Sequence, residues 1–164
     1  MKKVLPGFAF KKSVERLRKG IKKVLRKDEL ANKGVADAVS FIETKTMKKW
    51  GSLIKFNDPS SKPKNLFEDK TVQFKLVVLG APDDVLQTFV SGEDQAFFES
   101  STDLLEALVD VISSYYVFHI NYPYQMSGIL FFIQDFALDV SDTTQRSIKY
   151  SSFVAELQSD VHRQ

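Results

Sequence analysis

The chain of 164 residues contains no cysteine, and it is poor in histidine, tryptophan and proline, with two, one and five copies. Without thiolates it can form no disulfide framework, no cysteine nucleophile and no thiolate zinc site. His119 and His162 alone cannot hold a metal ion without several carboxylates beside them. The composition therefore indicates neither a metal site nor a cofactor.

Long apolar runs are also missing. The longest stretch without a charged residue covers residues 111–134, and Pro123 and its polar neighbours divide it into pieces shorter than the ~20 apolar residues of a membrane span. The start, MKKVLPGFAFKK, is interrupted by Pro6 and Gly7 and is followed by no small-residue cleavage site. We expect a soluble intracellular protein, cytoplasmic or nuclear, with no transmembrane segment.

Cations and anions are separated along the chain. Residues 1–65 hold 18 Lys and Arg against 6 Asp and Glu, whereas residues 66–164 hold 5 against 15. The net charge of +2 thus hides one half of +12 and another of −10. Such asymmetry predicts a basic arm that meets an anionic partner, or that lies against the acidic half of the same chain.

Residues 8–28 combine a narrow apolar stripe with a dense set of cations. Phe10, Val14, Leu17, Ile21 and Val24 follow one another at intervals of four and three residues, which predicts an amphipathic helix. The other positions include nine cations, which we predict to form a polyanion-binding site: Lys11, Lys12, Arg16, Arg18, Lys19, Lys22, Lys23, Arg26 and Lys27.

Several partners fit this basic helix. It could bind the phosphates of RNA or DNA without sequence preference, or serve as a nuclear-import signal. The same pattern fits an anionic membrane surface or a calmodulin-type acceptor. The remaining alternative is a solvated helix that lies on the acidic half of the chain. Nucleic-acid binding through the basic helix at 11–27 is therefore kept as an alternative function, and the residues single out no protein partner and no oligomeric state.

The change of charge sign coincides with a linker. A second helix is expected from Val35 to Lys49, followed by a short apolar cluster around Trp50, Leu53 and Phe56. The sequence NDPSSKPKN at 57–65 has the composition of a linker. We therefore expect four parts, which are a basic helical arm (1–56), a linker (57–65), a small α+β domain (66–140) and a polar, frayed C-terminal tail (141–164).

The second half begins with a strand pattern. Residues 72–79 alternate apolar and polar side chains, residues 85–91 form a weaker strand, and a turn containing Pro82 lies between them. We read a β-hairpin, to which a short strand at 95–98 could be added.

Two apolar helices follow this hairpin. They are expected at about 102–119, with Ser101 or Thr102 as N-cap, and at about 124–138. Tyr115, Tyr116 and Phe132 are expected on their inward faces. The fold class is therefore α+β, a hairpin packed with two apolar helices behind a basic helical arm.

No set of residues specifies a catalytic centre. His119 is the best single acid–base candidate, with Asp135 on the next helix as a group that could approach it. A lone histidine near a helix end is more often structural. The carboxylates of the turns fit no known cation-binding loop and are read as solvated: Asp83, Asp84, Glu93 and Asp94. We assign no catalytic residue and no metal ligand, and expect no enzyme.

A resemblance supports this reading. The segment YYVFHINYP at 115–123, followed by FFIQ at 131–134, lies within a region of about 74–139 that resembles the C-terminal part of lineage-expanded animal proteins, many of them from fish. Some of these are named sterile-alpha-motif-domain-containing-like proteins, and many are associated with mobile elements. The resemblance implies a non-enzymatic interaction module without a cofactor, of which this chain looks like a short or truncated copy.

Overall fold

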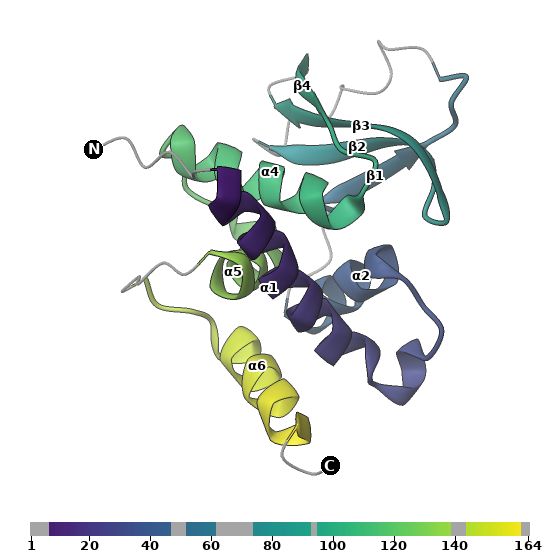
Figure 1. Cartoon of the computed structure of the whole chain (residues 1–164). Helices are drawn as coiled ribbons and strands as arrows, with labels where there is room; N and C mark the ends of the chain where they lie inside the picture. Colours follow the sequence, from purple (N-terminus) through teal and green to yellow (C-terminus); the bar gives the residue numbers. More distant parts are fainter. Residues whose placement is uncertain (1–6, 47–51, 62–73, 93–94, 139–143, 162–164) are drawn as a thin grey trace.

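The computed structural model describes residues 7–46, 52–61, 74–92, 95–138 and 144–161, which form five α-helices and one four-stranded mixed sheet (Figure 1). The α+β class predicted from the sequence is confirmed. The first half contains α1 (Gly7–Leu25), a 3-10 turn η1 (Asp28–Leu30) and α2 (Val35–Thr46). The end of the expected second helix, residues 47–49, lies outside the described residues.

The sheet has the order β1-β2-β3-β4. β1 (Ile54–Asn57) runs parallel to β2 (Lys75–Ala81), and β3 (Asp84–Gly92) pairs antiparallel with both β2 and β4 (Gln95–Ser100). The predicted first strand was 72–79, of which residues 72 and 73 lie outside the described residues. β1 was not predicted as a strand, because four residues are too few for a clear alternation of side chains.

The remaining helices are α4 (Leu104–Val117), a 3-10 turn η2 (Tyr124–Met126), α5 (Ser127–Ala137) and α6 (Ile148–Val161). The N-cap of α4 is Asp103, and the expectation of Ser101 or Thr102 was wrong. The Asp103 carboxylate accepts hydrogen bonds from the backbone N–H groups of Leu105 and Glu106, which helices leave without an internal partner.

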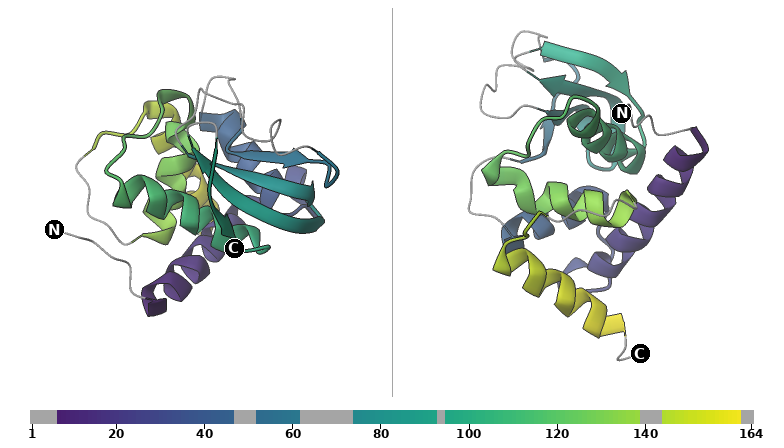
Figure 2. Two further views of the ribbon diagram at one scale, coloured as in Figure 1. Left: turned by 90° about the horizontal axis from the view of Figure 1, so that it is seen from above. Right: turned by 90° about the vertical axis from the view of Figure 1, so that its left-hand side faces the viewer.

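The elements stack in layers. Figure 2 shows the sheet on one side of α4, with α5 and then α6 on the other, and α1 along the edge of the stack. α4 contacts β2, β3 and β4, whereas α5 packs against α1, α2 and α4. The sequence analysis placed both apolar helices against the hairpin. In the structure α4 is the one that covers the sheet, and α5 fills the space between α4 and the N-terminal helices.

The two halves of the chain share one hydrophobic core. Leu17 and Val24 of α1 and Ile42 of α2 are fully buried in the same cluster as Leu108 of α4 and Phe132 of α5. The division at 57–65 stays a prediction. The shared core is the physical argument against independent folding of residues 66–164, because that fragment would expose the apolar side of α5.

The expected polar tail contains a packed helix. Tyr150, Phe153 and Leu157 of α6 are buried, at helical intervals of three and four residues. Asp135 of α5 holds the start of this helix, because it accepts hydrogen bonds from the Arg146 guanidinium at 2.6 Å and the Tyr150 hydroxyl at 2.6 Å. The many serines of the tail concealed this stripe in the sequence.

None of the described helices combines the length and the apolar character that crossing a membrane requires.

Candidate functional site

The predicted basic helix is α1, and its apolar stripe is turned into the protein. Leu17 and Val24 are fully buried, and Val14 and Ile21 are 5% and 2% exposed. Successive residues of a helix are rotated by about 100°, so these positions define one side. Gly20 lies at the edge of the same side, where it is buried against Phe136 of α5. The stripe therefore fixes which cations point outward.

Five of the nine predicted cations point away from the stripe, four of them on α1 and one, Arg26, in the turn that directly follows its last residue. All five are exposed, and among the described residues none of them takes part in an ion pair. They are called the basic ridge here: Lys11, Lys12, Lys19, Lys22 and Arg26. Because a helix rises 1.5 Å per residue, the ridge is about 22 Å long.

Arg18 also lies near the ridge, but it is engaged. Its guanidinium Nε is 3.2 Å from Oε1 of Glu15, one turn away on the same helix. Glu15 is the one carboxylate in the sequence of α1.

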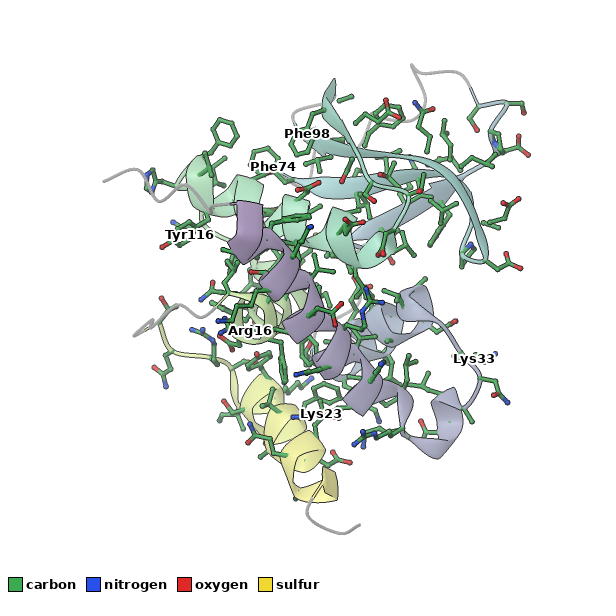
Figure 3. The ribbon with its side chains drawn as sticks, in the orientation of Figure 1. Arg16, Lys23, Lys33, Phe74, Phe98 and Tyr116 are labelled. Atoms are coloured by element: carbon green, nitrogen blue, oxygen red, sulfur yellow. The ribbon has the colours of Figure 1, made fainter. Side chains whose placement is uncertain are left out.

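The other three predicted cations form a flank that serves the packing of the protein. Figure 3 shows Arg16 and Lys23 on the side of α1 that faces α6. Lys23 Nζ lies 5.9 Å from the centre of the Phe136 ring, and Lys27 Nζ lies 3.0 Å from Oε1 of Glu156 on α6. The structure therefore divides the predicted site into a solvent-facing ridge and a flank with partners inside the chain.

The basic ridge has the chemistry of an electrostatic surface. It presents ammonium and guanidinium groups, which donate hydrogen bonds to phosphate oxygens. It carries no aromatic side chain on which a base could stack, and no Asn or Gln that could read a base edge. A surface of this kind holds a phosphate backbone and does not distinguish sequences.

The acid–base pair considered in the sequence analysis is not assembled. His119 is exposed just after the end of α4, where its backbone has φ 53°, a left-handed conformation. Asp135 instead binds Arg146 and Tyr150. Asp83 and Asp84 lie exposed around the turn between β2 and β3, and Glu93 and Asp94 lie outside the described residues.

Two groups with perturbed pKa values join elements of the fold. Burial raises the pKa of Glu43 on α2 to about 7, although the Leu53 N–H donates a hydrogen bond to its carboxylate at 3.0 Å. Burial also raises the pKa of Tyr115 on α4 to about 12. Its hydroxyl accepts from the Phe74 N–H at 3.0 Å and donates to the Phe74 carbonyl at 2.8 Å. These contacts connect α2 to β1 and α4 to the start of β2.

The sequence analysis missed the difference between ridge and flank. The helical positions of the nine cations were available, since each follows from its distance to the apolar stripe. What the sequence lacked were the positions of α5 and α6, which decide that Lys23 meets Phe136 and Lys27 meets Glu156, whereas Lys19 and Lys22 are exposed to solvent.

Comparison with protein-family models, with curated proteins and with solved structures finds no match to this chain.

Proposed function

We propose that the protein is a non-enzymatic interaction module that binds nucleic acid through the basic ridge. The observation that carries the proposal is the burial of the α1 stripe, which leaves five cations in one row facing solvent. Duplex DNA carries one negative charge per about 1.7 Å of its axis, so a ridge about 22 Å long can meet several phosphates at once.

The buried stripe favours nucleic acid over the other partners of a basic helix. An amphipathic helix binds a membrane surface or a calmodulin-type groove by inserting its apolar side. In α1 that side already packs against α5 and α4. Binding to phosphates needs the cations alone, and so it requires no rearrangement of the core.

Other features agree with a binding role without catalysis. Asp135 binds Arg146 rather than His119. Glu43 and Tyr115, whose pKa values are raised, form hydrogen bonds that join elements of the fold. The resemblance of residues 74–139 to mobile-element-associated proteins implies the same.

The test is the salt dependence of binding to a 20-base-pair duplex, measured by fluorescence anisotropy between about 50 and 200 mM salt. Five phosphate contacts predict that log affinity falls by about 4.5 units per unit of log salt. Replacing Lys12, Lys19 and Lys22 with Gln should lower this slope by about 2.7 units.

The matched control removes the same charge elsewhere. Lys33, Lys45 and Lys149 are exposed in the α1–α2 turn, on α2 and on α6. Their replacement with Gln should change the salt slope by less than about 0.9 units, the contribution of one phosphate contact. Equal losses in the two variants would show that only net charge matters and would overturn the assignment to the ridge. Absence of binding at the lowest salt would overturn the proposed function itself.

A further inference from the structure

A single carboxylate stands in the middle of the basic ridge. Glu15 is exposed on the outward side of α1, and its closest helical neighbours at three and four residues are Lys11, Lys12, Arg18 and Lys19. Side chains at these spacings lie about 5–6 Å apart at Cβ. Every neighbour of Glu15 along this side is therefore a cation, and one of them, Arg18, is bound to it at 3.2 Å.

This carboxylate divides the ridge into two clusters. Lys11 and Lys12 lie on its N-terminal side, and Lys19, Lys22 and Arg26 lie on its C-terminal side. The centres of the clusters are about 16 Å apart along the helix. A phosphate that approaches the middle of the ridge meets the negative charge of Glu15, and the guanidinium that could attract it is already engaged.

We propose that Glu15 determines the affinity of the ridge for polyanions, because its charge keeps the two clusters separate and withholds Arg18 from the phosphates. The inference rests on the proposed function and concerns the same surface. It also names the class of ligand, an extended polyanion that reaches both clusters. A small phosphorylated metabolite can occupy one cluster at a time.

The test is a gain of binding in Glu15→Gln. Glutamine keeps the length and helix propensity of the side chain and removes its charge. Arg18 then becomes one further phosphate contact, so the salt slope for the 20-base-pair duplex should rise by about 0.9 units. At about 0.1 M salt the affinity should increase about fivefold to tenfold.

Two further variants test whether Arg18 causes the gain in affinity. Arg18→Gln in the otherwise unchanged chain should lower affinity less than the same substitution does in the Glu15→Gln background, because breaking the ion pair with Glu15 offsets part of what Arg18 gains from a phosphate. In the Glu15→Gln background the same substitution should remove most of the gain. A gain that persists without Arg18 would overturn the role given to this residue.

The control for net charge is Glu99→Gln. Glu99 is exposed on β4, remote from α1 in the sequence and on the sheet side of α4 (Figure 1). This variant should bind like the unchanged protein. An equal gain in Glu99→Gln, or no gain in Glu15→Gln when the unchanged protein binds, would overturn the inference. Failure of both proteins to bind at the lowest salt would instead refute the proposed function.

Discussion

Gly20 provides a sharp test of how α1 packs, because it lies directly against Phe136 of α5. A Cβ atom placed on Gly20 would be 2.7 Å from Cδ1 and 2.9 Å from Cγ of Phe136. Carbon atoms in contact are normally about 3.5–4.0 Å apart. The half-buried Phe136 ring cannot retreat toward the core, since on that side it stacks on the fully buried Phe132 ring at 4.4 Å between centres.

Two opposing effects set the expected cost of Gly20→Ala. Alanine in a helix interior is favoured over glycine by about 1 kcal/mol. Overpacking of a core costs about 1–3 kcal/mol, and the fixed ring puts this site toward the upper end. We expect a net loss of about 1–2 kcal/mol in the free energy of unfolding. With a urea m-value of about 2 kcal/mol/M, the midpoint should fall by about 0.5–1 M.

The double variant Gly20→Ala with Phe136→Ala tests whether contact with the Phe136 ring causes the loss of stability. Once the ring is removed, the overlap with Cγ and Cδ1 disappears and the helix preference for alanine remains. Gly20→Ala should then be neutral or stabilising in the Phe136→Ala background, which corresponds to a coupling of about 2 kcal/mol between the two sites. An unchanged or raised urea midpoint for Gly20→Ala alone would refute the close packing of α1 on α5.

Two other contacts give predictions of their own. The pKa of Glu43 is raised from 4.5 to about 7, so the folded state favours the neutral acid. Glu43 therefore contributes stability that is fully present below about pH 4.5 and is lost as the pH rises through 7. Between about pH 4.5 and 8, urea titrations should show that the free energy of unfolding of the unchanged protein falls by up to about 3 kcal/mol relative to that of Glu43→Gln. A difference between the two proteins that does not change with pH would contradict this. Tyr115→Phe leaves the Phe74 N–H and carbonyl without the hydroxyl and should cost about 1–3 kcal/mol in thermal unfolding. The loss should exceed that of Tyr116→Phe at the neighbouring half-buried ring, and equal losses would refute the role of the Tyr115 hydroxyl.

Local periodicity was enough to predict much of the fold. The stripe from Phe10 to Val24 identified α1 and its buried side, and the α+β class followed from the change between helical and strand patterns. The nine cations were read from the sequence alone. Five of them are the solvent-facing ridge, which agrees with the simplest expectation for residues opposite an apolar stripe.

The parts that escaped prediction depend on neighbours far away in the chain. Tyr115 and Tyr116 are adjacent and similar, yet Tyr115 is 1% exposed and Tyr116 is half-buried, because successive residues of a helix point about 100° apart and Tyr115 is the one directed at Phe74. The close contact of Gly20 with Phe136 joins two residues that are more than 100 positions apart in the sequence. β1 pairs in parallel with a strand that begins about 20 residues later, and no local pattern specifies such a partner.

The separation of α1 from α5 along the chain sets an order of events during synthesis. Ser127, the first residue of α5, follows Leu17 by about 110 residues, and ribosomes add about 5–20 residues per second. For roughly 5–20 s after the apolar stripe of α1 has been synthesised, α5, against which it packs, has not yet been synthesised. Halted nascent chains that end before Ser127 should therefore be captured by chaperones, and chains long enough for α5 to have emerged from the ribosome should be released.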